Sequence, residues 1–547
     1  MKIVKLLILT LLTQLSFGQT QKDTLSMIDK TLSQYVASNP GCQLSVSKNG
    51  KLIYSNAVGM ADLEHNIPLT TNSLLEAGSV SKQFTAAAIL LLEQQGKLSL
   101  DDDVRKYIPE LPDYGTPIKL HHMLHHTSGL RDWGVIAAYT GWPRGTKFYT
   151  NDDALDIISR QKGLNNKPGD EFIYSNSNYN LFAIIVQRVS GLTLADFTKK
   201  YIFEPAEMTH TQWRDDPNKI VPNRAIAYSN TKNGYKTDMP NEYVYGNGGL
   251  LTTTEDLLKW NQFYQEGRLG NPSLLLKQTQ TELLNDNKKN EYAAGLYIKK
   301  VSGWDNISHG GTAGGYRSYL EVYPQLNISI AVLSNTSQFS PNVVSSNVAK
   351  IFMPDISDKE KVTKNPKQDS FVVLPEEKLN RYVGTYKWDT KSVLFDLKVK
   401  GKGLLLKNQI LFKPVSENRF VAKNSFLEIK GNKGIYVNYS NNDTIHYTKL
   451  PSTKLLDTKP LEKEVSAFKG KYFSEETNSG ASIYQENDKL IIRLNPNVAY
   501  ILIPSYKDVF VVENADTELK IIRNSYNEIK SFTLSSERAI NVEFKKL

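Results

Sequence analysis

Two copies of one tetrapeptide place a serine three residues before a lysine, at residues 45–48 and 79–82. This is the spacing of nucleophile and base in one class of serine hydrolase. The chemistry requires the lysine amine to reach the serine hydroxyl and remove its proton. The surrounding sequence therefore has to decide which of the two pairs can meet.

The predicted local structure separates the two copies. Ser45 and Lys48 lie in the first strand of a predicted hairpin with an Asn49-Gly50 turn, where side chains three apart point to opposite faces. Ser79 and Lys82 open a predicted helix, where positions three apart share a face and the helix N-terminus favours a developing oxyanion. The second copy is the candidate catalytic pair. On this motif alone, a simple helix cap at Ser79 is the alternative.

A Tyr-Ser-Asn tripeptide occurs four times, and the same argument selects one copy. The copies at Tyr54 and Tyr228 lie in predicted hairpins, and the copy at Tyr439 lies before a turn. Tyr174 follows a Pro-Gly loop and precedes an amphipathic helical pattern. Short loops that dock on a helix commonly display binding groups, so the tripeptide from Tyr174 to Asn176 is the candidate.

A glycine-rich element occurs once, as residues 309–312, beside a predicted strand. It consists of His309, Gly310, Gly311 and Thr312. Glycines in a strand let a ligand or another backbone approach closely. A plain glycine-rich turn is the alternative interpretation.

Length and composition predict an ordinary globular protein of two to four domains. The chain has 547 residues, 22% charged and 40% hydrophobic, with a formal net charge of +9. Its lysines are scattered and often stand beside acids, so no nucleic-acid partner is expected. Cys42 is the only cysteine, which excludes an intrachain disulfide.

Residues 1–18 have the pattern of a secretory signal peptide, with two early lysines, an apolar core and small residues after it. We therefore expect an exported protein, periplasmic or secreted. No cysteine follows the apolar core, so a lipid anchor is not indicated. No other segment has an uninterrupted apolar run long enough to span a membrane, and stable membrane insertion is not expected.

The remainder divides by its pattern into four segments. Residues 22–355 mix helical and strand patterns, and residues 356–372 form a charged linker without periodicity. Residues 373–455 and 460–547 hold short alternating strands and repeat one another, with the Gly-Thr-Tyr at 384–386 matching the Gly-Lys-Tyr at 470–472. Two small antiparallel β-barrels are the natural interpretation of these repeats.

Five segments together resemble the serine β-lactamase-related family, which includes class C β-lactamases, D,D-peptidases, D-aminopeptidases and esterases. They lie at residues 77–112, 121–130, 167–191, 245–260 and 308–315, and the resemblance covers roughly residues 25 to 350. It implies an α+β fold, the penicillin-recognising serine hydrolase domain, with an antiparallel sheet flanked by helices and a helical subdomain. The C-terminal tandem is similar to the lipocalin-like domains of D-aminopeptidases.

The resemblance also implies a role for each matched residue. Ser79 is the acylated nucleophile, and Lys82 is its base or proton conduit. Tyr174 passes the proton to the leaving group and activates the deacylating water, and Asn176 orients Lys82 and donates to a substrate amide. The backbone N–H groups of Ser79 and Thr312 form the oxyanion hole, and residues 309–312 line the substrate site.

One residue departs from the pattern of many β-lactamases and D,D-peptidases, because His309 stands where they carry lysine. A neutral histidine supplies less positive field to Tyr174 and to a substrate carboxylate. This disfavours efficient β-lactam turnover and favours the peptidase and esterase branches. Arg317 is the candidate for the missing charge.

The resulting expectation is a serine hydrolase that forms an acyl-enzyme with D-amino-acid amides, peptides or related substrates, with cell-wall fragments among the candidates. Two alternatives stay open, an esterase of small acyl esters and a catalytically weak binding or regulatory protein. No cofactor is expected. Four histidines, at positions 121, 122, 125 and 126, raise the possibility of a metal site. We predict no metal, because no HExxH motif or clear third ligand accompanies them.

Overall fold

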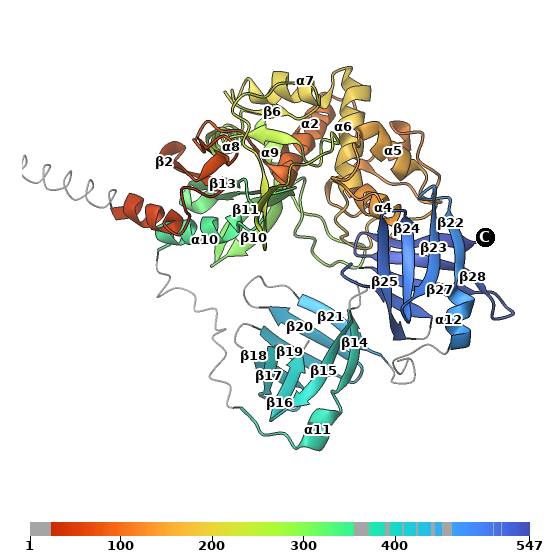
Figure 1. Ribbon diagram of the computed structural model, residues 1–547. Coiled ribbons are helices and arrows are strands. Elements are labelled where there is room, and N and C mark those ends of the chain that lie inside the picture. Colours follow the sequence, from red (N-terminus) through yellow and green to blue (C-terminus); the bar gives the residue numbers. More distant parts are fainter. Residues whose placement is uncertain are drawn as a thin grey trace, which may run out of the picture. The chain divides into compact units, whose positions relative to one another are not determined.

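The structure is a computed structural model (Figure 1). It describes residues 23–354, 371–388, 394–406, 410–422, 425–438, 444–450 and 462–547, except 507 and 516. The chain forms two compact units, Met1–Gly134 with Pro143–Pro354, and Val135–Trp142 with Asp355–Leu547. The predicted signal peptide, nearly all of the predicted linker and the tripeptide at Tyr439 lie outside the described residues.

A six-stranded antiparallel sheet forms the centre of the first unit, in the order β10-β11-β12-β13-β1-β2. The N-terminal hairpin therefore joins the edge of a meander that comes much later in the chain, through pairing of β1 with β13. The turn between β1 and β2 uses positive φ at Asn49 (51°) and Gly50 (72°), as a two-residue hairpin requires. The strands are Cys42–Lys48 (β1), Lys51–Val58 (β2), Tyr297–Val301 (β10), Trp304–Ala313 (β11), Tyr316–Tyr323 (β12) and Ile328–Ser334 (β13).

Helices cover both faces of this sheet, because successive side chains along β1 point to opposite faces and contact different helices. Leu44 and Val46 belong to one hydrophobic cluster with Val344 and Val348 of α10 (Pro341–Phe352). Ser45 points the other way and its Oγ lies 2.7 Å from Oγ1 of Thr254, on α8 (Thr254–Gln265). The first Ser-x-x-Lys copy is thus a structural part of the sheet, and Lys48 Nζ donates to the Leu326 carbonyl at 2.5 Å.

The central helix of the first unit is α2 (Lys82–Gln94), which is buried from Lys82 to Leu92. A helix that is apolar all round is expected in the middle of a core, and α2 packs against α6 (Asn176–Ser190). Gly191 ends α6 with a φ of 76°, the left-handed cap that its sequence predicts. The other helices up to residue 354 are α3 (Leu120–Leu124), α4 (Trp133–Tyr139), α5 (Asn151–Ser159), α7 (Leu194–Thr198) and α9 (Pro272–Thr279).

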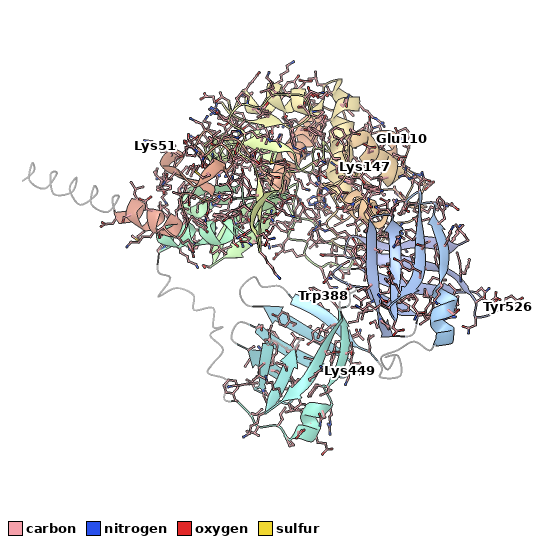
Figure 2. All side chains as sticks on the ribbon, in the orientation of Figure 1. Lys51, Glu110, Lys147, Trp388, Lys449 and Tyr526 are labelled. Carbon is pink, nitrogen blue, oxygen red and sulfur yellow. The ribbon has the colours of Figure 1, made fainter. Side chains whose placement is uncertain are left out.

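Short elements complete the first unit. They are β3 (Met60–Asp62), β4 (Ile67–Pro68), β5 (Leu75–Glu76), β6 (Gln212–Trp213), β7 (Tyr228–Thr231), β8 (Gly234–Thr237), β9 (Leu250–Thr252), η1 (Gly78–Ser81), η2 (Val104–Lys106), η3 (Lys199–Phe203) and η4 (Pro324–Leu326). Charged side chains such as those of Lys51 and Glu110 are exposed at the edge of this unit (Figure 2). Among the described residues no single helix could cross a membrane, although α6 with residues 194–203, bent by 77°, is long and apolar enough as a pair.

The C-terminal region folds into two closed eight-stranded antiparallel barrels, coloured teal and blue in Figure 1. The first has strands β14 to β21, at Gly384–Trp388, Leu394–Lys400, Gly403–Leu406, Ile410–Pro414, Arg419–Ala422, Ser425–Lys430, Lys433–Asn438 and Thr444–Lys449. The second has β22 to β29, at Gly470–Ser474, Ser479–Glu486, Lys489–Asn495, Val498–Tyr506, Val509–Val512, Glu518–Arg523, Ile529–Ser536 and Ala539–Lys546. Each follows a short helix, α11 (Glu376–Asn380) or α12 (Glu462–Phe468).

The repeated Gly-x-Tyr motif has the same function in both barrels. Tyr386 and Tyr472 are fully buried in the first strand of their barrels. Their hydroxyls donate to the carbonyls of Tyr382 and Phe468, four residues upstream, at 2.8 Å each. The motif therefore fixes the entry of the chain into each barrel, and the expectation of a tandem of small barrels is confirmed.

Candidate active site

In the second Ser-x-x-Lys copy the serine and lysine side chains are in contact, as their spacing predicts. Ser79 lies in η1, a tight 3-10 turn, and Lys82 is the first residue of α2. Lys82 Nζ lies 3.1 Å from Ser79 Oγ. The lysine is fully buried, whereas Ser79 is partly exposed, so the hydroxyl is accessible and its partner is shielded from water.

The Lys82 amine lies among hydrogen-bond acceptors. Besides Ser79 Oγ, Nζ donates to Asn176 Oδ1 at 2.9 Å and to the Asn247 carbonyl at 2.6 Å. A neutral amine retains two N–H groups, which suffice for the two carbonyl oxygens, and its lone pair then faces the serine hydroxyl. The site can thus hold Lys82 in place both before and after it takes the proton from Ser79.

A buried carboxylate fixes the orientation of Asn176. The backbone N and the side-chain Nδ2 of Asn176 both donate to Oδ2 of Asp132, at 2.8 Å each. A carboxylate only accepts, so Nδ2 must face Asp132 and Oδ1 must face Lys82. One of the two Nδ2 hydrogens is used in this way, which leaves the other for the predicted contact to a substrate amide.

Sequence reasoning missed Asp132 and Asn247. Asp132 lies just after the matched segment 121–130, and Asn247 lies within the matched segment 245–260. Asn247 is held in turn by Asn180 of α6, whose Nδ2 donates to Asn247 Oδ1 at 2.7 Å. Proximity to the matched segments was the only signal in the sequence, because the contacts join residues far apart in the chain.

Two glycines bring the backbones of η1 and β11 together. A Cβ on Gly311 would lie 2.1 Å from the Ala77 oxygen and 2.9 Å from the Ser79 nitrogen. A Cβ on Gly78 would lie 2.6 Å from the Thr312 nitrogen. Only glycine allows this close approach of the two backbones, which carry Ser79 N and Thr312 N, the two predicted oxyanion-hole donors.

His309 differs from the substrate-binding role expected for it, because its ring is buried and internally bonded. Nδ1 lies 2.6 Å from the Gly310 carbonyl, which only accepts, so Nδ1 carries the proton. Nε2 then accepts from the hydroxyl of Tyr292 at 3.0 Å. Burial, followed by the charge of Lys82, lowers the pKa of His309 to about 3. The ring is neutral, and neither nitrogen is left for a substrate carboxylate.

Tyr174 lies over the histidine-rich segment. Its ring centroid is 4.1 Å from that of His126 and 4.9 Å from Lys82 Nζ. The backbone N of Ser175 donates to His126 Nδ1 at 3.2 Å, which fixes the tripeptide on this support. The structure therefore gathers Ser79, Lys82, Tyr174 and Asn176, and their predicted catalytic roles remain predictions.

Arg317 lies opposite Thr312 in the β11–β12 pairing. Cross-strand partners project from the same face of a sheet, so the guanidinium and the Thr312 side chain share a face. Its NH1 donates to the Gly314 and Tyr316 carbonyls at 2.7 and 2.8 Å. Burial lowers the pKa of Arg317, and Asp238 opposes that shift. Arginine nonetheless keeps its charge at neutral pH.

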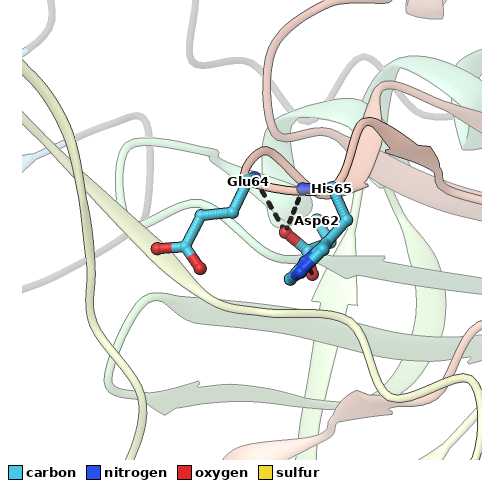
Figure 3. Close-up of side chains that lie close together, drawn as sticks. All are labelled: Asp62, Glu64 and His65. Carbon is cyan, nitrogen blue, oxygen red and sulfur yellow. Dashed lines mark hydrogen bonds and ion pairs between the residues drawn. The ribbon is translucent and has the colours of Figure 1, made fainter.

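One exposed group of metal-ligand type is a structural turn. Asp62, Glu64 and His65 bring three potential ligand atoms within 4.8 Å of one another (Figure 3). Asp62 Oδ1 accepts from the backbone N of Glu64 at 2.8 Å and of His65 at 3.2 Å. Asp62 Oδ2 lies 2.8 Å from His65 Nδ1. Both oxygens stabilise the turn, so the cluster does not indicate a metal site.

The antiparallel sheet, the buried central helix and the clustered Ser-x-x-Lys, Tyr-x-Asn and His-x-Gly motifs define the penicillin-binding and β-lactamase fold. A family model described as Beta-lactamase matches residues 28–350. This is more than half of the chain, and the chain belongs to the β-lactamase family. The resemblance expected from the motifs is confirmed.

Named relatives support this assignment. The chain is 29% identical over 298 residues to a D-aminopeptidase of Gluconobacter oxydans, covering 54% of this chain and 56% of that protein. It is 30% identical over 318 residues to penicillin-binding protein 4* of Bacillus subtilis, covering 53% of this chain and 67% of that protein. The match to the D-aminopeptidase thus spans only a little over half of that relative's length.

Among solved structures, the octameric penicillin-binding protein homologue from Pyrococcus abyssi has a TM-score of 0.53 at 24% identity. The match covers 79% of this chain and 100% of that chain. At this identity the likeness shows the fold alone. The family relationship and the fold are therefore established, and hydrolases are among the homologues.

Proposed function

We propose that this protein is an exported serine hydrolase that forms an acyl-enzyme on Ser79 and acts on D-amino-acid amides or short peptides. The observation that carries the proposal is the Lys82 amine, 3.1 Å from Ser79 Oγ and held by Asn176 and Asn247. A buried lysine with this set of acceptors is arranged for proton transfer to and from serine.

The reaction starts when Ser79 Oγ attacks the substrate carbonyl carbon and Lys82 takes the hydroxyl proton. The carbonyl oxygen becomes an oxyanion, which accepts hydrogen bonds from the N–H groups of Ser79 and Thr312. The carbon–nitrogen bond breaks, the proton passes through Lys82 and Tyr174 to the leaving amine, and an ester on Ser79 remains. A water molecule then loses its proton to the same pair and hydrolyses that ester, which restores the free serine.

The chemistry around His309 favours a substrate with an amide or a free amino group over a substrate whose own carboxylate would bind at this position. The neutral ring uses both nitrogens inside the protein. The relative named D-aminopeptidase is consistent with such a preference. Arg317, the cross-strand partner of Thr312, is the candidate cation for binding a substrate carboxylate. Unchanged KM values of Arg317→Ala for anionic substrates would exclude that role.

The first test labels the purified protein with a serine-reactive fluorophosphonate and maps the adduct by mass spectrometry. We expect the adduct on Ser79, its loss in Lys82→Met, and its retention in Ser45→Ala, the matched control from the other tetrapeptide. Paired D- and L-amino-acid anilides, a small acyl ester and a chromogenic cephalosporin then define the substrate class. An adduct on Ser45, or none, would refute an activated Ser79 and favour a binding or regulatory protein. Ester turnover without D-anilide turnover would favour the esterase alternative.

Export is proposed from residues 1–18, which have the signal-peptide pattern. Expression in a Gram-negative host with N-terminal sequencing of the periplasmic fraction tests it. We expect a chain in that fraction whose N-terminus lies close to position 19, just after the small residues that end the pattern. An uncut chain in the cytoplasm would contradict export and leave the hydrolase proposal untouched.

A further inference from the structure

A buried ion pair joins the chain just before Ser79 to the chain just after Asn247. Its members, Glu76 and Arg214, are 2% and 4% exposed. The Nε of Arg214 donates to Glu76 Oε2 at 2.9 Å, and a second guanidinium nitrogen lies 3.5 Å from Oε1. Oε1 also accepts from the backbone N of Gly249 at 3.2 Å. The carboxylate is thus bound both by a side chain and by the backbone of a distant segment.

The pair lies where two short strands release the chain toward the catalytic residues. β5 and β9 are antiparallel, and Glu76, the last residue of β5, lies opposite Leu251 near the start of β9. The chain after β5 and the chain before β9 therefore emerge at the same end. One leads to Ser79, and the other carries the Asn247 carbonyl that accepts from Lys82 at 2.6 Å. A change in the distance between these segments would move an acceptor of Lys82 relative to the nucleophile.

Glycines leave these two segments without side chains that could hold them together. A Cβ on Gly248 would lie 3.7 Å from the oxygen of Gly78, so the segments are neighbours there. The ion pair supplies the missing constraint through Gly249. Glu76 binds the backbone N of Gly249, and the backbone N of Arg214 donates to the Gly249 carbonyl at 2.7 Å. Both backbone polar groups of Gly249 are therefore bound by the two members of the pair.

Stability alone does not account for a pair of charges at this position. The cost of removing two charges from water largely offsets their attraction, and apolar side chains of similar volume often stabilise a protein as well. One guanidinium nitrogen of Arg214 is also buried without a hydrogen-bond partner among the described residues, which costs free energy. The ring of Tyr243, 5.0 Å from the guanidinium carbon, offsets only part of this cost. The orientation of Gly249 explains the two residues better.

We infer that Glu76 and Arg214 are positioning residues for the reaction at Ser79. They hold the segment of Asn247 beside the segment of Ser79, so that Lys82 reaches the serine hydroxyl and the Asn247 carbonyl at once. They act through the backbone of Gly249 and not on the substrate. This inference rests on the proposed function, because it assigns two further residues to the same site.

The test separates geometry from stability by replacing both members of the pair in the full-length protein. Glu76→Leu with Arg214→Met leaves no unpaired charge, so the thermal midpoint should stay within about 5 °C of the wild-type value. The limiting rate of fluorophosphonate labelling of Ser79 should nevertheless fall at least ~10-fold, because small displacements of reacting groups are costly. The reagent concentration that gives half of this rate should change less than ~3-fold, since the pair does not touch the reagent.

Glu76→Gln is the second variant, and it should show the opposite balance. It keeps an oxygen for Gly249 N, so labelling should be faster than in the double variant. It leaves the Arg214 charge buried without a carboxylate, so the midpoint should fall by roughly 10 °C. Glu93→Leu with Lys277→Met removes a partly exposed ion pair of 2.9 Å and is the matched control, with labelling unchanged. All rates are measured at one temperature well below every midpoint.

A merely structural role makes the labelling rate follow the thermal midpoint, with Glu76→Gln slower than the double variant. That order, or wild-type labelling in the double variant, would overturn the inference and leave the proposed function intact. If the double variant does not fold, Glu76→Gln decides: a fall of ~3-fold or more in the limiting rate supports the inference, and a wild-type rate overturns it. A wild-type protein that gives no adduct on Ser79 would refute the proposed function and this inference with it.

Discussion

Asp132 is predicted to set the catalytic geometry through Asn176, and Asp132→Asn isolates this effect. The carboxylate receives two hydrogen bonds from Asn176 and a third, at 2.9 Å, from the backbone N of Gly134 to Oδ1. The substitution keeps size and shape and removes the charge. The substitution also allows two wrong orientations. Either the side-chain amide nitrogens at positions 132 and 176 face each other, or Asn176 turns its Nδ2 toward Lys82.

The magnitude follows from the two bonds to Asn176. A hydrogen bond to a charged group contributes about 1.5–3 kcal/mol, and a neutral acceptor retains roughly half of this. Two weakened bonds therefore lose about 1.5–3 kcal/mol. If the loss appears in the transition state, in which Lys82 must hold its position, kcat/KM falls about 10- to 150-fold. The rate of fluorophosphonate labelling of Ser79 should fall in parallel, while KM changes little.

The diagnostic variant exchanges the two side chains, Asp132→Asn with Asn176→Asp. The new carboxamide can donate to the new carboxylate, which still accepts from Lys82, so labelling should exceed that of Asn176→Asp alone. A carboxylate beside Lys82 favours the charged form of the lysine, which cannot act as the base, so the acidic limb of the rate profile is expected to move to higher pH. Asp156→Asn, at an exposed ion pair with Arg160, is the surface control. If kcat/KM of Asp132→Asn equals the wild-type value, Asp132 does not set the catalytic geometry through Asn176.

Three further predictions follow from the same geometry. Gly311→Ala forces η1 and β11 apart and should lower kcat by at least ~10²-fold, whereas Gly310→Ala, whose Cβ meets nothing closer than 3.4 Å, should retain most activity in the same assay. Ser45→Ala removes a bond to Thr254 and should cost about 1 kcal/mol in urea unfolding with no change in labelling rate. Because its folded pKa lies below the unfolded value, His309 binds fewer protons when folded, and wild type should lose stability as pH falls from about 6.5 toward 3. His309→Gln should lose less over that range, and equal losses in acid unfolding would contradict the neutral buried ring.

The parts of the fold that depend on neighbouring residues were predictable from the sequence. The Asn49-Gly50 turn and the Gly191 helix end each follow from the φ values of a few adjacent positions. The pairing of β1 with β13 does not, because no local pattern says which of several apolar strands will be neighbours. The resemblance supplied that information, through the fold it implied.

The candidate site also has features that the local sequence predicts and features that depend on residues distant in the chain. Periodicity alone selected Ser79 with Lys82 over Ser45 with Lys48, because a strand and a helix place positions three apart so differently. Asp132 orients Asn176, which is distant in the chain, and nothing in the flanking sequence marks an aspartate that will be close to that asparagine. His309 was matched to its motif, yet its chemistry depends on Tyr292, which lies in no matched segment. Motifs thus located the candidate reacting groups, and long-range contacts decide the protonation state and orientation in which those groups are held.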